Sequence, residues 1–426
     1  MIKGSAENED DEQRQEQEDG LQVETNKLKR VFRHRDFRLL WTGAFFSFIG
    51  SWIQNIAEGY LVYQLTKSEY LLGLVSFFGM LPVTLFGLFA GSLTDTLNKR
   101  VLLVITQSVF ALSACFLAAA TYFGFVQYWH IVVVALIVGT MGALDMPTRQ
   151  SIISRVVPKE DLPVAIPINA LTFNMARLVG PAVGGVLLAL FGPAVCYFVN
   201  GLSFFALIFA GLAIRADLKA TAREPQPLKD LIFEGFLYTI RELRLRTIFV
   251  LEASVAIFGL FYLSQIPAIA DKLFHLPKTG LWVSYLSVGI GSVSALVTVT
   301  TLAEKPVKAT LLRLAISIIA LSLLSLSFTQ NVVLGYVVFA CLGFASVMVF
   351  NTCNTLFQLL SPERLRGRVL SMHVWAVSGL GPFGVWGFGF FAEKYGLRTA
   401  FQLAGGILVL AAAFAWAYRK GLAGVR

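Results

Sequence analysis

Twelve long apolar runs constrain the fold of this chain more than any other feature of its sequence. Each is about 20 residues long, the length that an α-helix needs to cross the hydrocarbon core of a membrane. Charged residues make up 14% of the chain, against about 25% in soluble globular domains. We therefore expect an all-α polytopic membrane protein, because helices satisfy their own backbone hydrogen bonds in lipid. The runs lie near residues 39–65, 71–93, 101–123, 131–157, 164–190, 194–214, 248–270, 281–302, 307–328, 332–359, 369–391 and 400–418.

The two halves of the chain share short sequences in the same order, which indicates an internal duplication. Duplicated membrane proteins are typically transporters whose site lies between the two repeats. We therefore predict twelve transmembrane helices in two six-helix halves, and transport as the function. The matched pairs are Phe191-Gly192 with Tyr395-Gly396, Asn200-Gly201 with Ala404-Gly405, Gly180-Pro181 with Gly381-Pro382, and, more weakly, the segment 91–95 with 300–304.

The distribution of charge predicts the orientation. Most of the 35 Lys and Arg residues fall on the side of the N-terminus, so the positive-inside rule places both termini in the cytoplasm of a multi-pass protein in the cell (inner) membrane. The basic cluster before the first run would contact anionic lipid headgroups, so the net charge of +9 requires no nucleic acid. The expected parts are a disordered cytoplasmic tail with a basic juxtamembrane segment (1–35), an N-terminal bundle (36–214), a cytoplasmic linker with a surface helix near 228–245 (215–246), a C-terminal bundle (247–420) and a cytoplasmic tail (421–426).

Enzymatic chemistry finds little support in the sequence. The four cysteines fall inside apolar runs and the four histidines are scattered, so we expect no metal site and no cofactor. Lys67-Ser68 and Lys278-Thr279 lack the glycine pattern of a phosphate-binding loop. A polytopic membrane enzyme or a signalling scaffold remains the alternative from another functional class.

Ionisable residues inside the runs are the candidates for ion coupling, because a charge in hydrocarbon must be paired or wetted. Glu58 lies among apolar residues in the first run, one turn beyond Gln54. Burial favours the neutral form of a carboxyl group, which suits proton exchange. Arg177, at a similar depth in the fifth run, is the expected counter-charge. A static structural ion pair is the alternative. Glu252 begins the seventh run and is expected at the membrane interface.

A second group of charges lies near the cytoplasmic ends of the runs and is predicted to gate the transporter. Asp145 and Arg149 are four residues apart and so share one helix face; a self-satisfied surface pair is the alternative. The other predicted gating residues, from the loop after the second run, are Asp95, Lys99 and Arg100.

Aromatic and amide residues in the runs are candidates for a substrate cavity, because flat rings with a few fixed polar groups suit a bulky, partly apolar ligand. The predicted lining residues are Trp52, Gln54, Asn55, Asn174, Tyr262, Gln265, Asn351, Asn354, Gln358 and Trp375.

Two motifs resemble those of the major facilitator superfamily. The segment 91–100, GSLTDTLNKR, resembles the loop between helices two and three of that superfamily, with Thr96 in place of a basic residue and Asn98 in place of glycine. Asn98 is expected to preserve a left-handed turn. The segment 177–185, RLVGPAVGG, resembles the Gly-Pro-x-x-Gly-Gly motif of antiporter branches; a Gly/Pro kink without a coupling role is the alternative. The expected helix-packing residues are Gly91, Gly180, Pro181, Gly184 and Gly185.

Longer matches narrow the resemblance to the enterobactin-exporter-like (MFS_3-type) branch. They are DFRLLW (36–41), GSW (50–52), LVYQLT (61–66), DMPTRQ (145–150), EDLP (160–163) and PERLRGRV (362–369). The resemblance implies proton-coupled export of an amphipathic small molecule, such as a siderophore or a macrolide-like drug, by a monomer in contact with membrane lipids. Transport of a lysophospholipid, or uncoupled facilitation, is the alternative within transport.

Overall fold

The computed structural model describes residues 29–219, 228–276, 278–302, 305 and 307–418. Every regular element in these ranges is a helix. Most of the predicted tails, 1–28 and 421–426, lie outside them. The elements are α2 (Arg35–Thr66), α3 (Glu69–Thr96), α4 (Lys99–Tyr122), α5 (Tyr128–Val156), η1 (Lys159–Asp161), α6 (Leu162–Phe191), α7 (Pro193–Ala213), α8 (Leu228–Arg241), α9 (Leu243–Phe258), α10 (Tyr262–Lys272), α11 (Lys278–Thr301), α12 (Lys308–Phe328), α13 (Val332–Leu360), η2 (Glu363–Leu365), α14 (Arg366–Val374), η3 (Trp375–Gly379), α15 (Gly381–Tyr395) and α16 (Leu397–Ala417).

Eleven segments of the described chain are long and apolar enough to cross a membrane. One of them joins α9 to α10, and another runs from η2 through α14 and η3 to α15. Helix α2, 32 residues long, is the twelfth helix of the bundle, and Gln54, Asn55 and Glu58 make it less apolar than the others. The prediction of an all-α protein with twelve membrane helices is therefore confirmed.

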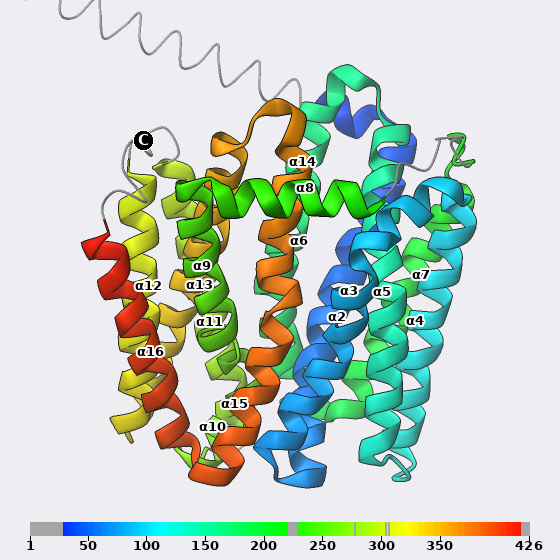
Figure 1. Cartoon of the computed structure of the whole chain (residues 1–426). Helices are drawn as coiled ribbons and strands as arrows, with labels where there is room; N and C mark the ends of the chain where they lie inside the picture. Colours follow the sequence, from blue (N-terminus) through cyan, green and yellow to red (C-terminus); the bar gives the residue numbers. More distant parts are fainter. Residues whose placement is uncertain (1–28, 220–227, 277, 303–304, 306, 419–426) are drawn as a thin grey trace, which may run out of the picture.

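The helices form two halves that pack by the same pattern. In the first half α3 packs on α5 and α4 packs on α7; in the second α11 packs on α13 and α12 packs on α16. Figure 1 shows the first half in blue to green and the second in green to red, side by side. Across the seam, α3 packs on α15 and α6 packs on α11. Two copies of one arrangement thus face each other along two helix pairs.

The matched glycines occupy equivalent places in the two halves. Gly192, between α6 and α7, has φ of 80°, and Gly396, between α15 and α16, has φ of 86°. Side chains disfavour this backbone region, so glycine is required at both turns. Gly201 and Gly405 permit close packing: an added Cβ would lie 2.8 Å from Cys115 Sγ in the first case and from Leu324 Cγ in the second.

The two ends of the bundle differ. We call the end where α2 begins and α16 ends the terminal side, and the opposite end the far side. Helix α8, within the predicted linker, lies across the terminal side (Figure 1). Its Glu234 forms ion pairs with Arg364 (2.7 Å) and with Arg368 of α14. Helix α9 begins at Leu243, so its first turn lies inside the predicted linker.

The loop between α3 and α4 differs from the expectation at Asn98. We expected a left-handed turn there, but Asn98 has φ of −68° and ψ of 111°. Its side chain instead accepts hydrogen bonds from the backbone N–H groups of Arg100 (3.0 Å) and Val101 (3.3 Å). Asparagine is well suited to this N-cap role, so the residue starts α4 rather than bending the loop.

Candidate functional site: a cavity between the two halves

A cavity of about 510 Å³ lies between the two halves. This volume falls within the range of small-molecule sites in proteins, about 300 to 1,000 Å³. Residues from both halves line it, so any rearrangement of the halves would change its shape and its openings. The lining residues from the first half are Trp52, Gln54, Asn55, Ile56, Glu58, Gly59, Val62, Leu72, Val75, Ser76, Gly79, Met80, Ala135, Val138, Arg177 and Pro181; those from the second are Leu260, Tyr262, Leu263, Ser264, Tyr285, Val288, Gly289, Ser292, Val377, Gly381 and Val385.

Glu58 of α2 lies on this cavity and is oriented by a chain of polar groups. Ser203 Oγ donates to Asn200 Oδ1 (3.0 Å), and Asn200 Nδ2 donates to Gln54 Oε1 (2.6 Å). With its oxygen so engaged, Gln54 hydrogen-bonds the Glu58 side chain one turn away through its amide N–H. Among the ion pairs of the described side chains, none includes Glu58. The carboxyl group is thus held in place by amides and faces the cavity without a fixed cation.

Arg177 of α6 lines the same cavity. Its guanidinium carbon lies 5.7 Å from the centre of the Trp52 ring, a cation–π arrangement that partly offsets the loss of water. Helices α2 and α6 are neighbours, as the hypothesis of an ion pair with Glu58 required. The two side chains line one cavity but form no ion pair in the described structure. Each therefore remains available to a ligand.

The far side is closed by polar contacts between the halves, which we call the far-side latch. Lys272 Nζ lies 2.6 Å from Glu69 Oε1, and Lys67 Nζ lies 3.2 Å from Asp271 Oδ2. Tyr63 also donates to Asp271 (3.0 Å). Ser68 Oγ donates to Glu393 (2.9 Å), and the Gln265 amide donates to the backbone oxygen of Glu69 (3.3 Å).

Close packing of the seam helices accompanies the far-side latch. A Cβ at Gly73 of α3 would lie 2.7 Å from Val385 O, and one at Gly389 of α15 would lie 2.6 Å from Glu69 O. Backbones that approach this closely leave no room for a passage. The ion pairs described on the terminal side, in contrast, join groups within one half or to α8, as in the pairs of Asp161 with His34 and of Glu234 with Arg368. One hydrogen bond, from Thr84 to Ser378 O (2.9 Å), joins the halves one turn from the cavity toward the terminal side. The cavity is thus sealed from the far side.

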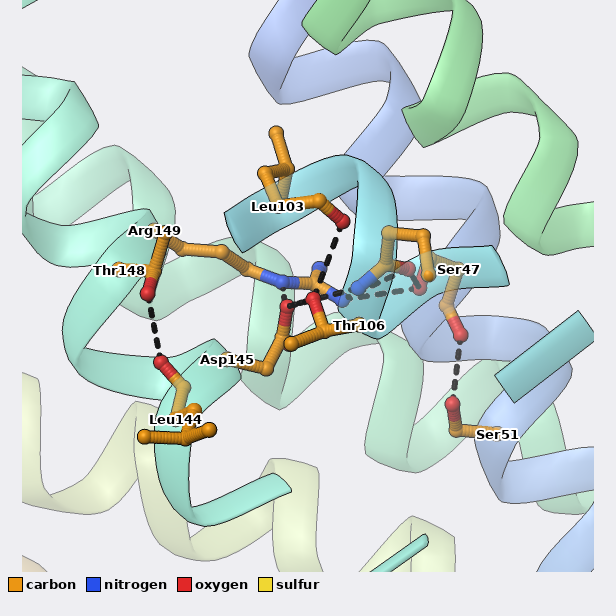
Figure 2. A network of polar contacts seen from close by, with 9 residues as sticks. Ser47, Ser51, Leu103, Thr106, Leu144, Asp145, Thr148 and Arg149 are labelled. Atoms are coloured by element: carbon orange, nitrogen blue, oxygen red, sulfur yellow. Dashed lines mark hydrogen bonds and ion pairs between the residues drawn. The ribbon is translucent and has the colours of Figure 1, made fainter. Parts of the chain in front are cut away.

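The Asp145–Arg149 pair lies inside the first half (Figure 2). Arg149 Nε lies 2.6 Å from Asp145 Oδ2, and both residues are less than 10% exposed. Asp145 Oδ1 accepts from Thr106 (3.1 Å) and Gln107 (2.6 Å), and Arg149 donates to Ser47 (3.1 Å). The pair is therefore a buried network joining α2, α4 and α5, not the surface pair that was its alternative. Its role as a gate stays a prediction.

The other predicted gating residues lie at the ends of α3 and α4. Arg100 donates to the backbone oxygens of Ile214 (2.6 Å) and Ala216 (3.3 Å), which follow α7. Lys99 is buried, and its backbone N–H donates to Leu218 O (2.9 Å). These contacts tie the start of α4 to the chain beyond α7. The surroundings of Gly91, and the side chains of Asp95 and Asn174, lie outside the described residues.

The predicted packing motif of α6 lies against both halves. A Cβ at Gly180 would lie 2.3 Å from Trp52 Cβ, and one at Gly184 would lie 2.9 Å from Ile53 Cα, both in α2. A Cβ at Gly185 would lie 2.3 Å from Trp282 Cβ, in α11 of the other half. Pro181 lines the cavity. The motif therefore brings α6 into backbone contact with its own half and with the opposite one.

The predicted lining residues divide into two groups. Trp52, Gln54, Asn55 and Tyr262 line the cavity, together with Glu58 and Arg177. Gln265 instead belongs to the far-side latch. The remaining four lie elsewhere in the second half: Asn351 donates to Val347 O within α13 (2.9 Å), Asn354 and Gln358 hydrogen-bond each other (2.5 Å), and Trp375 stacks on Phe249 (6.2 Å).

Sequence reasoning missed two features. Tyr285 and Ser292 of α11 line the cavity; their polar groups inside an apolar run were the signal. Glu252, expected at the interface, is buried in contact with His373, both about 1% exposed. Helix α9 begins at Leu243 rather than near residue 248, so Glu252 lies more than two turns inside it. Among the described residues, no group of three or more His, Cys, Asp or Glu side chains is arranged to hold a metal ion.

Comparison with known proteins decides the family. The sequence profile of transmembrane secretion effectors (MFS_3) matches residues 30–422. The chain belongs to this family, within the major facilitator superfamily. The chain is 25% identical to the staphyloferrin A transporter of Staphylococcus aureus over 376 residues, 86% of this chain and 92% of the relative. It is 25% identical to the multidrug efflux pump Tap of Mycolicibacterium fortuitum over 366 residues, 83% and 88% of the two chains.

Solved structures share the fold. A bacterial homologue of the human lysosomal transporter Spinster, in an inward-facing and unoccupied conformation, matches with a TM-score of 0.70 and 16% identity over 93% of this chain and 98% of that chain. The nucleoside transporter NupG matches with a TM-score of 0.69 and 15% identity over 91% and 99%. At these identities the likeness establishes the fold of this chain and nothing about its substrate.

Proposed function

We propose that this protein is a secondary active transporter that exports an amphipathic small molecule from the cytoplasm in exchange for protons, by alternating access. The observation that carries the proposal is the cavity between the halves, shut at the far side, with the Glu58 carboxyl group on its wall and no fixed cation beside it. The excess of basic residues on the terminal side supports a cytoplasmic location for that side, so the cavity would serve the cytoplasm in this conformation. We propose that one chain suffices, because both halves of the site belong to it.

Competition at Glu58 would couple the two fluxes. An ionised Glu58 attracts a ligand that carries a positive charge or hydrogen-bond donors. When the far side opens, a proton from outside binds the carboxylate oxygen, which removes that attraction and releases the ligand. The proton then dissociates into cytoplasmic water after the cavity returns to the terminal side. Because proton and ligand exclude each other at one carboxyl group, each turnover exchanges one for the other.

The chemistry of the cavity supports an amphipathic ligand. The wall is mostly apolar, with rings from Trp52, Tyr262 and Tyr285. Arg177 adds a cation opposite in sign to Glu58, so a molecule with both acidic and basic or donor groups would find partners for each. The relatives named above agree with this class, being a staphyloferrin A transporter and a multidrug efflux pump. Macrolide efflux protein A of Streptococcus pyogenes, similar over 35% of this chain, belongs to the same class.

Proteoliposomes that contain a pH-sensitive dye test the proposal. The purified protein would be exposed to siderophores, macrolides and lysolipids in turn, with and without an imposed proton gradient. The proposal expects at least one compound to cause proton movement that depends on the protein. Movement of a labelled compound with no proton response would overturn proton coupling and indicate an uncoupled carrier.

A further inference from the structure

A second pair of ionisable groups lies buried in the second half, outside the cavity. His373 Nδ1 of α14 lies 2.8 Å from Glu252 Oε1 of α9, and the two side chains are 1% and 2% exposed. A carboxyl group and an imidazole in contact can share one proton at no net charge, whereas an isolated buried charge would be costly. The pair therefore has the chemistry of a proton-binding site.

The surroundings of the pair are apolar. The Phe350 and Phe357 rings of α13 lie 4.8 and 5.8 Å from the His373 ring. Cys353 of α13 is a buried titratable side chain close enough to Glu252 for the two to interact electrostatically. Glu234 of α8 pairs with Arg364 and Arg368, and the Glu252–His373 contact is the ion pair described for either of these two residues. No third described charge thus holds the pair in one protonation state.

A chain of amides leads from the pair toward the terminal side. His373 Nε2 lies 3.4 Å from Asn354 Nδ2, and Gln358 Nε2 donates to Asn354 Oδ1 (2.5 Å). Gln358 is exposed and lies two residues before the end of α13 at Leu360. The buried imidazole is therefore linked to the surface by two hydrogen-bonding side chains.

The direction of these hydrogen bonds depends on the proton. A neutral imidazole that donates from Nδ1 to Glu252 accepts at Nε2 from the Asn354 amide. When the pair gains a proton, Glu252 donates its O–H to Nδ1 and the ring N–H lies on Nε2, so Asn354 would have to present Oδ1 and release Gln358. Proton binding at the pair would thus rearrange α13.

Helix α14 continues directly to the cavity and to the seam. Four residues beyond His373, Val377 lines the cavity within the π-helical turn η3. In the same turn, Ser378 O accepts a hydrogen bond from Thr84 of the first half (2.9 Å). A π-helical turn is a frequent site of functional adjustment in helices. A change at His373 therefore reaches both the ligand site and a contact between the halves.

We propose that Glu252 and His373 form a second proton-binding site of the transporter, filled and emptied from the terminal side past Asn354 and Gln358. The inference rests on the proposed proton antiport. In the transfer, a hydronium ion that reaches the pair loses a proton, an O–H bond forms at the Glu252 carboxylate, and water remains. One transport cycle would then move a proton at Glu58 and a second at this pair.

Infrared spectra of the full-length purified protein test the site without any substrate. Between about pH 6 and 9 exposed carboxyl groups stay ionised. The difference between spectra at the acid and alkaline ends of this range therefore shows the bands of buried carboxyl groups that change protonation. We expect two protonated-carboxyl bands, one lost in Glu58→Gln and the other lost in Glu252→Gln. His373→Gln should shift the titration midpoint of the second band by at least one pH unit. The matched control is His34→Gln, which alters a carboxylate–imidazole contact of 2.7 Å with Asp161 on the terminal side and should leave both bands unchanged.

The possible outcomes separate the two proposals. If Glu58→Gln removes its band and Glu252→Gln and His373→Gln change nothing, the second site is wrong and the proposed function stands. If Glu58→Gln changes nothing, Glu58 is not the proton carrier, whatever the pair does. Should the Glu252 variant fail to fold, the ¹⁵N spectrum of wild-type protein labelled at its four histidines still decides: the N–H of the His373 ring must move from Nδ1 to Nε2 within this pH range, and an invariant signal would overturn the site.

Discussion

Lys272 Nζ of the second half lies 2.6 Å from Glu69 Oε1 of the first, across the far side of the bundle. Glu69 is 1% exposed whereas Lys272 is 47% exposed, so the lysine brings its charge from the edge to a buried carboxylate. In a protein that alternates between two openings, this contact exists only while the far side is closed. It therefore stabilises one of the two states and must break in every cycle.

Loss of this ion pair should favour opening at the far side. Lys272→Gln leaves the Glu69 carboxylate buried without its cation in the closed state only. We expect the far-side-open population to rise about tenfold, equivalent to about 1.4 kcal/mol. The measurement is the rate at which an impermeant maleimide applied from the far side labels a cysteine placed at Ser76 on the cavity. The control is Lys394→Gln. The Lys394 ammonium lies over the Tyr395 ring of its own helix and so does not join the two halves. Equal labelling rates in the two variants would show that the Lys272–Glu69 ion pair does not hold the far side closed.

The close approach of α6 to α11 should tolerate no side chain at Gly185. A Cβ there would lie 2.3 Å from Trp282 Cβ, so Gly185→Ala must separate the helices. Overpacking of this kind costs about 1 to 3 kcal/mol. We expect a lower aggregation temperature of the purified protein and slower transport. Gly142→Ala on α5, where an added Cβ meets nothing within 4 Å, is the matched control and should behave as wild type. A Gly185 variant as stable as this control would contradict the packing.

The buried Asp145–Arg149 network should be costly to break from one side. Asp145→Asn leaves the Arg149 guanidinium, 6% exposed, without its carboxylate, and such a loss costs about 3 to 5 kcal/mol. Lys67→Gln removes an ion pair whose side chains are 63% and 49% exposed, worth about 1 kcal/mol or less. Thermal stability in detergent should therefore fall far more in the first variant. A similar loss in both would show that the network in Figure 2 is not a structural unit.

Arg177 should act on the ligand rather than on the proton. Its guanidinium lies over Trp52 on the cavity wall and pairs with no described carboxylate. We expect Arg177→Gln to raise the KM for an anionic or zwitterionic substrate about tenfold, about 1.4 kcal/mol, with the proton-to-substrate ratio unchanged. Arg177→Lys, which keeps the charge, should recover part of the affinity. A changed ratio in Arg177→Gln would restore the hypothesis of a working pair with Glu58; that hypothesis fails outright if the double variant Glu58→Gln/Arg177→Gln transports like wild type.

Much of the fold could be predicted from the sequence because hydropathy and glycine act locally. Apolar runs give the helices, and the paired turns at Gly192 and Gly396, both with positive φ, mark the duplication. Glu58 was identifiable as a cavity residue because a carboxyl group inside an apolar run is energetically costly unless it is paired or lies in a wet cavity.

The positions of the other candidate residues depend on which face of each helix points to the cavity and on the residue at which each helix begins. Asn351 has the same amide chemistry as Asn55, yet it donates to Val347 O of its own helix while Asn55 lines the cavity. Trp375 lies at the start of a π-helical turn, which residue periodicity does not predict. Glu252 was misplaced because the seventh run was started several residues too late, which moved a buried carboxyl group to the interface.

A comparison of wild type with Glu58→Gln decides whether Glu58 carries the coupling proton. Wild type and Glu58→Gln would be reconstituted in separate proteoliposomes in parallel. Each would be assayed for uphill transport driven by a proton gradient, and for exchange of labelled against unlabelled substrate without a gradient. We expect Glu58→Gln to lose uphill transport but to keep exchange at saturating substrate, because exchange needs the cavity but no proton. The KM for exchange should rise, because the neutral amide lacks the carboxylate's attraction for the ligand. Uphill transport by Glu58→Gln at the wild-type rate would show that Glu58 does not carry the coupling proton.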